Sequence, residues 1–194
     1  MPNEDFKIPD APYLSVQISS ANNTQKHKNW PISYWNKLLE LISEQYERFH
    51  FVLIGDANET SLADQLVESG IKRVHSSVGR TSISELTRII RDSTLFIGLD
   101  GGPMHIAVSQ GTPTFTIWGA SDYNLYGYQN INKENNKIAY KEISCHPCNS
   151  WIAPNTSRVM DPQECPDFAC IRSLKPEEVF SQLTPFANRI LNSK

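Results

Sequence analysis

The sequence predicts an α/β fold, in which helices cover both faces of a doubly wound parallel sheet. Short apolar runs alternate with helical patterns up to about residue 120, and these runs are apolar at successive positions instead of at every second one. Strands with apolar side chains on both faces are typical of parallel sheets buried between two layers of helices. Glycine, serine or an acidic residue follows most of the runs and marks where each strand should end.

The individual elements follow from local patterns. Apolar and β-branched runs predict strands at residues 13–18, 51–54, 74–76, 95–99 and 114–118, and a further strand over 137–143. Helical spacing and start signals predict helices after Trp30-Pro31, from about Ser61 to Gly70, from the capping box Ser82-Ile83-Ser84-Glu85, over 103–110 and from Pro176. Pro185 should kink or break the last helix, because proline lacks a backbone donor and its ring clashes with the preceding turn.

Length and composition restrict the classes of protein to consider. A chain of 194 residues, 39% hydrophobic and 20% charged, is long enough for one domain, or two small ones, with a proper core. A net charge of −3 and the lack of a basic stripe argue against nucleic acid as a partner. No apolar run approaches membrane-spanning length, and Met1–Asp10 is too polar for a signal peptide. The cytoplasm is therefore the expected compartment, with peripheral attachment to the inner membrane left open.

The strongest functional signal is the stretch 95–108, where an apolar strand ends in Asp100, two glycines and a proline. Proline suits the first turn of a helix, and Gly101 and Gly102 would let a ligand approach the backbone closely. Free N–H groups and the positive end of the helix dipole favour an anion there, most often a phosphate. His105 is placed to face the same anion. The alternative is a glycine pair that only reverses the chain direction.

Polar and charged residues also follow the other predicted strands: Ser19, Ser20, Lys26 and Lys28 after the first, and Gly55, Asp56 and Glu59 after the second. Because the carboxyl ends of parallel strands share one edge, hydroxyls, glycine amides, a lysine and carboxylates should meet there, as a nucleotide diphosphate requires. Each has a plainer explanation: the lysines as solvated surface charges, Glu59 as a helix cap. No GxGxxG follows the first strand, which argues against a nicotinamide-dependent dehydrogenase.

The pattern as a whole resembles glycosyltransferase family 9, which contains the lipopolysaccharide heptosyltransferases, and specifically the C-terminal, donor-binding half of its members. The matching motifs are Lys28-Asn29-Trp30-Pro31, Val52-Leu53-Ile54-Gly55, Arg80-Thr81-Ser82-Ile83, Gly98 to Ala107, Gly111-Thr112-Pro113 and Gly119-Ala120-Ser121-Asp122. The segment from Asp100 to His105 is the most specific of them. The resemblance implies that residues 13–194 form a Rossmann-like nucleotide-sugar-binding domain, half of a GT-B fold, behind a linker or tail at residues 1–12.

The resemblance also implies roles for individual residues. A nucleotide sugar, commonly ADP-heptose, would be bound without a catalytic cofactor or divalent metal. Lys28 would pair with the donor phosphates, and Asp100 would contact the sugar or the surroundings of the leaving group, so these two are the candidate catalytic residues. Thr81 would lie near the adenine. The other donor-binding candidates are Ser19, Ser20, Gly55, Asp56, Glu59, Gly101, Gly102, Pro103, Met104 and His105.

The sequence departs from the family pattern in two ways. The family usually has serine or threonine where Gly101 stands, and the glycine removes a hydroxyl from the phosphate site. The N-terminal half of the family, which holds the acceptor and supplies a general base, has no counterpart here, since the first strand begins at Tyr13. We therefore expect the donor half of an inverting glycosyltransferase, inactive alone, with an acceptor-binding domain in the same or another chain. A non-catalytic nucleotide-sugar-binding or assembly module is the alternative.

The cysteine-rich segment 144–173 has little apolar periodicity. Its four cysteines, a CxxC followed by a looser pair, provide the ligand count for tetrahedral zinc or iron: Cys145, Cys148, Cys165 and Cys170. Family relatives often show a similar segment, and some related protein heptosyltransferases hold iron there. A structural metal, disulfides and free thiols all remain open from the residues alone, and each implies a structural role.

Overall fold

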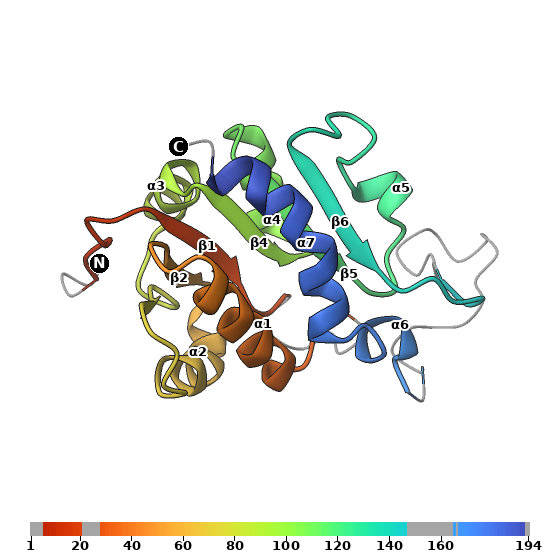
Figure 1. Cartoon of the computed structure of the whole chain (residues 1–194), viewed down its shortest axis with the longest axis horizontal. Helices are drawn as coiled ribbons and strands as arrows, with labels where there is room; N and C mark the ends of the chain where they lie inside the picture. Colours follow the sequence, from red (N-terminus) through yellow and green to blue (C-terminus); the bar gives the residue numbers. More distant parts are fainter. Residues whose placement is uncertain (1–5, 21–27, 147–164, 166, 193–194) are drawn as a thin grey trace.

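Six strands form one sheet in the computed structural model, which describes residues 6–20, 28–146, 165 and 167–192 (Figure 1). The strands lie in the order β3-β2-β1-β4-β5-β6, and each neighbouring pair is parallel. Their bounds are β1 Tyr13–Gln17, β2 His50–Ile54, β3 Val74–Ser76, β4 Leu95–Leu99, β5 Thr114–Trp118 and β6 Asn136–Tyr140. The predicted strands are thus present, although β6 begins one residue earlier and ends three residues earlier than expected.

Helices cover both faces of the sheet. α1 (Ile32–Gln45) and α7 (Pro176–Leu191) pack against each other on one face, in front of the sheet in Figure 1. α3 (Ile83–Asp92) and α4 (Gly102–Ser109) pack against each other on the opposite face. The shorter helices are η2 Ala57–Glu59, α2 Thr60–Val67, α5 Tyr123–Tyr126 and α6 Ala169–Arg172.

Alternate residues of the strands enter two separate apolar cores. In β2, Phe51 and Leu53 belong to the core beneath α1 and α7, whereas Val52 and Ile54 belong to the core beneath α3 and α4. This burial of both faces explains why the strands are apolar at successive positions. The predicted doubly wound, Rossmann-like α/β fold is confirmed.

Helix α3 begins as its sequence predicts. Ser82 Oγ accepts a hydrogen bond from the Glu85 N–H at 3.3 Å, and Glu85 Oε2 accepts one from the Ser82 N–H at 2.8 Å. The two side chains therefore satisfy backbone donors that the first helical turn leaves open.

Helix α7 begins at Pro176 as predicted. The sequence predicts a kink or a break at Pro185, and of these two the break does not occur, because the helix continues to Leu191. Proline inside a helix costs about 3 kcal/mol. Leu183 and Phe186 flank the proline and are buried against the core shared with α1. Burying such side chains stabilises by about 1.5–3 kcal/mol each, which offsets that cost.

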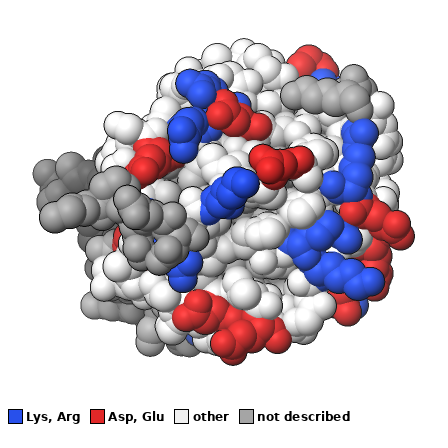
Figure 2. Space-filling view, turned by 90° about the vertical axis from the view of Figure 1, so that its left-hand side faces the viewer, with Lys and Arg blue, Asp and Glu red and all other residues white. Residues whose placement is uncertain are grey.

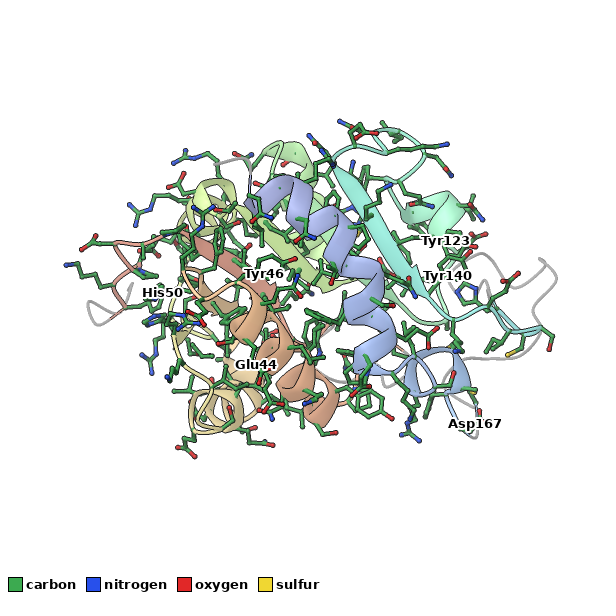
Figure 3. All side chains as sticks on the ribbon, in the orientation of Figure 1. Glu44, Tyr46, His50, Tyr123, Tyr140 and Asp167 are labelled. Carbon is green, nitrogen blue, oxygen red and sulfur yellow. The ribbon has the colours of Figure 1, made fainter. Side chains whose placement is uncertain are left out.

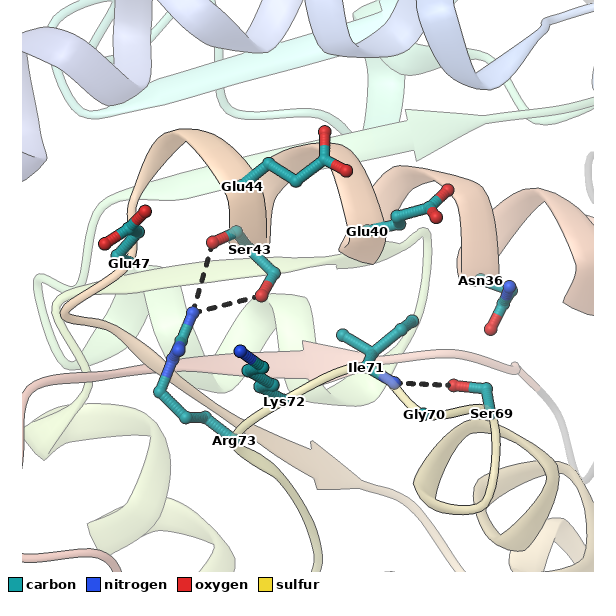
Figure 4. Close-up of a pocket in the computed structure, with 10 residues that line it drawn as sticks. All are labelled: Asn36, Glu40, Ser43, Glu44, Glu47, Ser69, Gly70, Ile71, Lys72 and Arg73. Atoms are coloured by element: carbon teal, nitrogen blue, oxygen red, sulfur yellow. Dashed lines mark hydrogen bonds between the residues drawn. The ribbon is translucent and has the colours of Figure 1, made fainter.

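A hollow of about 430 Å³ lies between α1 and the turn that leads from α2 into β3 (Figure 4). Arg73 fastens this turn to α1: its guanidinium donates hydrogen bonds to the Ser43 carbonyl at 3.1 Å, the Ser43 hydroxyl at 3.0 Å and the Phe49 carbonyl at 3.1 Å. The helix wall of the hollow is acidic, with Glu40, Glu44 and Glu47. Because the turn precedes β3, the hollow lies at the amino ends of the strands, away from the functional edge described below.

Two histidines pair between β2 and β3. His50 Nδ1 lies 2.8 Å from His75 Nε2, and the two rings are within 10° of parallel. His50 lies on the left-hand side of the view in Figure 3. Burial lowers the pKa of His75, and the neighbouring His50 lowers it further. The folded protein therefore favours a neutral His75.

We expect this histidine to make folding less favourable in mild acid. The unfolded chain binds a proton at His75 more readily than the folded chain, so stability is complete above the usual histidine pKa of 6.5 and falls as the pH drops below it. Urea unfolding at about pH 7.5 and about pH 5.5 should show a smaller pH-dependent loss for His75→Gln than for the wild type. An equal loss in both proteins would contradict this role of His75.

Charged side chains of both signs are interspersed on the face of the molecule that Figure 2 shows. This agrees with a sequence that has no basic stripe. Within the described part of the chain, no helix has both the length and the apolar character needed to cross a bilayer.

Candidate functional site

A cavity of about 400 Å³ opens at the carboxyl edge of the sheet, where β1, β2 and β4 end. The strand order reverses between β1 and β4, because β1 leads to β2 on one side and β4 leads to β5 on the other. Open α/β sheets bind ligands at such a reversal. Many of the residues predicted for the donor site line the cavity: Ser19, Ser20, Gly55, Asp56, Glu59, Thr81, Gly102 and Pro103.

The loop after β1 is fastened to the end of β4. The Ser20 N–H donates a hydrogen bond to Asn29 Oδ1 at 2.7 Å, and the Ser20 hydroxyl donates one to the Asp100 carbonyl at 2.9 Å. Ser20 and Asp100 are both buried. Since Asn29 directly follows Lys28, the same contacts also position Lys28. This role of Asn29 was not predicted, and its only signal in the sequence was its place in the Lys28-Asn29-Trp30-Pro31 motif.

The two candidate catalytic residues form an ion pair with each other. Lys28 Nζ lies 2.7 Å from Asp100 Oδ2, and the side chains are only 15% and 10% exposed. Salt screens such a sheltered pair less than a surface pair. Neither residue is among those lining the cavity, but Ser20 joins Asp100 to its wall. A ligand phosphate that binds Lys28 therefore has to compete with the Asp100 carboxylate.

Glu59 is a buried carboxylate in the cavity wall, 3% exposed. Burial raises its pKa and the charge of Asp56 raises it further, while hydrogen bonds from Ser19 and from the Asp56 backbone lower it. Glu59 Oε2 accepts a hydrogen bond from the Asp56 N–H at 3.2 Å, so Glu59 also caps η2. A Cβ on Gly55 would lie 2.0 Å from Glu59 Oε2, which explains the glycine at the end of β2. The two interpretations of Glu59, as a cap and as a cavity carboxylate, are therefore compatible.

The amino end of α4 faces the cavity through Gly102 and Pro103. Gly101 is the N-cap residue and has an extended backbone, with φ 178°. Pro103 occupies the first turn, where its missing N–H leaves no helical bond unmade. The first N–H groups of a helix and its dipole favour an anion at this position.

Two other predicted residues of α4 point elsewhere. Met104 is 2% exposed and packs in the core beneath α3 and α4, so its side chain serves packing. His105 is exposed, and its Nδ1 lies 2.9 Å from the Tyr128 hydroxyl. Neither lies in the cavity wall. Tyr128 was not predicted, because no sequence pattern links the loop before β6 to α4.

The mouth of the cavity carries an apolar side chain beside Thr81. Ile83, at the start of α3, is 72% exposed, and Leu86 lies one turn further along the same wall. An exposed isoleucine next to hydroxyls offers a flat apolar surface to a ligand ring. The sequence shows an apolar residue, Ile83, in the first helical turn directly after the capping serine. That pattern by itself does not indicate a function.

Aromatic side chains gather beyond β6. The rings of Tyr123 and Tyr140 lie 4.4 Å apart between centroids, and His146 stacks on Tyr123 at 5.5 Å. Figure 3 shows the two tyrosines side by side. A hydrogen bond to Tyr140, followed by burial, raises the pKa of Tyr123 to about 12. Tyr123 therefore remains neutral at physiological pH and serves as a packing and hydrogen-bonding group.

The cysteine prediction is only partly covered by the described residues. Cys170 is buried, Cys145 and Cys165 are half-buried, and Cys148 lies outside the described ranges. Within those ranges, no three histidine, cysteine or acidic side chains are gathered so as to hold a metal ion. The metal therefore stays a prediction.

The family model and the relatives that match this chain indicate the same protein family. The family model described as glycosyltransferase family 9 (heptosyltransferase) matches residues 3–156. A lipooligosaccharide heptosyltransferase 2 of Campylobacter jejuni is 29% identical over 162 residues, which are 80% of this chain and 45% of the relative. The chain thus spans about half the length of the curated relatives it matches.

Solved structures share the fold. Escherichia coli heptosyltransferase WaaC with ADP superposes with a TM-score of 0.63 at 16% identity, over 93% of this chain and 46% of WaaC. The dodecameric iron-containing heptosyltransferase TibC, in complex with ADP-D-beta-D-heptose, superposes with a TM-score of 0.66 at 16% identity, over 96% of this chain and 48% of TibC. At these identities the likeness establishes the GT-B type of Rossmann-like fold alone.

Proposed function

Because the chain belongs to glycosyltransferase family 9, the heptosyltransferase family, we propose that it binds the nucleotide of a nucleotide-sugar donor in the cavity at the carboxyl edge. The observation that carries the proposal is the gathering of serine hydroxyls, a buried carboxylate and a helix amino end around one cavity where the strand order reverses. ADP-heptose is the proposed donor, since structures of relatives contain ADP or ADP-heptose.

The phosphates would lie at the amino end of α4. Gly102 and Ser20 line the cavity there, and Lys28 is paired with Asp100, whose carbonyl accepts the hydrogen bond from the Ser20 hydroxyl. An ammonium group and backbone N–H groups provide charge-assisted hydrogen bonds to phosphate. On binding, Lys28 would exchange all or part of its contact with Asp100 for a phosphate oxygen, leaving Asp100 to meet the sugar.

The nucleoside would occupy the other end of the cavity. The Glu59 carboxylate is a strong acceptor for ribose hydroxyls, and the exposed Ile83 beside Thr81 offers an apolar surface to the base. A buried carboxylate that gains hydroxyl donors recovers part of the hydration that it lost on burial. In this proposal Glu59 recognises the ribose hydroxyls, and the amino end of α4 recognises the phosphates.

Sugar transfer would need groups beyond this cavity. Inverting transfer requires a base within hydrogen-bond reach of the acceptor hydroxyl. We propose that an acceptor-binding domain, in the same or another polypeptide, supplies that base, that this half alone transfers little, and that the complete enzyme acts in the cytoplasm. A binding or assembly module without transfer activity is the second candidate, favoured by Gly101, which offers no side-chain hydroxyl to a phosphate.

Calorimetric titration with ADP, UDP and GDP, followed by ADP-heptose, tests the proposed function. We expect ADP to bind more tightly than the other two nucleotides and the sugar to increase the affinity further, because Asp100 lies beside the phosphate end of the cavity. Failure of all four ligands to bind would overturn the proposal. Transfer measured with an added acceptor domain would separate the enzyme from the binding module.

A further inference from the structure

Gln17, the last residue of β1, is a buried polar residue in the cavity wall, 3% exposed. Its Nε2 donates a hydrogen bond to the Ser19 carbonyl at 2.9 Å, which fixes the orientation of the amide. Its Oε1 is buried and, among the described residues, finds no hydrogen-bond partner. An orphaned buried acceptor is costly, so this side chain is held here by something other than its own hydrogen bonding.

Gly101 lies directly against this amide. Its extended backbone, with φ 178°, is open to any residue, so conformational freedom does not explain the glycine. Lack of space explains the glycine, because a Cβ on Gly101 would lie 2.9 Å from Gln17 Nε2 and 3.1 Å from Ser20 Oγ. Contacts this short force one of the groups to move.

Gln17 has little freedom to move away. Its own Cβ lies against the bare face of Gly98, where an added Cβ would come within 2.9 Å of it. Its amide nitrogen is tied to the Ser19 carbonyl, and moving it would leave a second buried polar group without a partner. Gln17 is therefore wedged between Gly98 and Gly101, beneath the turn that opens α4.

We propose that Gln17 is a positioning residue of the donor site, whose carboxamide occupies the volume that a side chain at position 101 would need. It thereby excludes a side chain at position 101 and fixes the position of the Gly101-Gly102 backbone, so that a nucleotide diphosphate can contact the Gly102 N–H. This inference rests on the proposed donor site and adds a specific determinant to it. Position 17 sets which residue position 101 accepts.

A double-mutant cycle tests the coupling. The proteins are the wild type, Gly101→Ala, Gln17→Ala and the double variant, titrated with ADP and with adenosine. We expect Gly101→Ala alone to weaken ADP about tenfold and Gln17→Ala alone about threefold, and the double variant to bind ADP about as well as Gln17→Ala, as a shared volume requires. Adenosine, which has no phosphate, should respond less to all three changes.

A second background separates volume from hydrogen bonding. In Gln17→Leu the side chain keeps most of its bulk without the amide, so Gly101→Ala should remain harmful there. Additive penalties in the cycle, or rescue of Gly101→Ala by leucine as complete as by alanine, would overturn the proposal. Thermal unfolding of the same proteins measures the coupling without any ligand. If the wild type bound no ADP, the proposed function would be wrong. The double-mutant cycle measured by thermal unfolding would still show whether the side chains at positions 17 and 101 compete for the same volume.

Discussion

Replacing Lys28 with alanine is expected to weaken ADP binding at least about tenfold, because hydrogen bonds to charged groups contribute about 1.5–3 kcal/mol. The loss has two parts. The phosphate loses its only proposed side-chain cation, and the Asp100 carboxylate, which is 10% exposed, is left facing the phosphate without its partner at 2.7 Å. A negative charge that is no longer neutralised repels the ligand through a poorly screened environment.

Replacing Asp100, the other member of this ion pair, is expected to change ADP affinity in the opposite direction. Asp100→Asn keeps the shape of the side chain but removes the carboxylate that Lys28 contacts, so the ammonium group becomes more available to phosphate. We expect ADP to bind as tightly as to the wild type or up to about tenfold more tightly. The extra affinity that the sugar of ADP-heptose provides should fall, since the proposed sugar contact is lost.

Isothermal titration of both variants with ADP and ADP-heptose at one ionic strength gives all four affinities. Lys37→Ala is a suitable control, because Lys37 pairs with Glu40 on the exposed face of α1 and lies outside the cavity. If Asp100→Asn weakened ADP as much as Lys28→Ala does, the carboxylate would be holding Lys28 in place for the phosphate instead of competing for it. That outcome would contradict the competition inferred here.

Much of the site could be predicted because parallel strands bring their carboxyl ends to one edge. Ser19, Gly55 and Gly102 each follow a strand, and knowing the strands was enough to gather them around one cavity. The capping box at Ser82 was also readable, since its residues interact within one helical turn. Local patterns therefore predicted the sheet and the gathering of these residues at one edge of it.

Contacts between distant segments could not be predicted in this way. Gln17 is the last residue of β1, and only the packing of β4 beside β1 brings it against Gly101. The contact between His105 Nδ1 and the Tyr128 hydroxyl was not predicted, because Tyr128 comes from a loop without periodicity. Pro185 was expected to kink or break its helix, and tertiary packing of α7 keeps the helix continuous through it. Each case depends on a neighbour far away in the sequence.

Replacing Glu59 with glutamine is expected to stabilise the fold and to weaken nucleotide binding at least about fivefold. Burial raises the pKa of Glu59, so its charged form opposes folding at neutral pH, and a neutral amide removes that penalty. The carboxylate can accept from the Asp56 N–H and from ribose hydroxyls with different oxygens, whereas glutamine has one acceptor oxygen for both tasks.

The pH dependence distinguishes this charge from a merely structural cap. Ribose hydroxyls would bind the ionised form of Glu59, so ADP affinity in the wild type should rise as the pH increases through the raised pKa. Glu59→Gln should lack this contribution and keep only the change that comes from the second ionisation of the ADP phosphate. Glu85→Gln is a matched control, because Glu85 completes the same kind of capping box on α3 but is only half-buried and lies outside the cavity. Titrations of the three proteins between about pH 4.5 and about pH 8 measure this difference. Parallel profiles for all three would mean that Glu59 acts only as a cap, and the nucleoside end of the site would have to lie elsewhere.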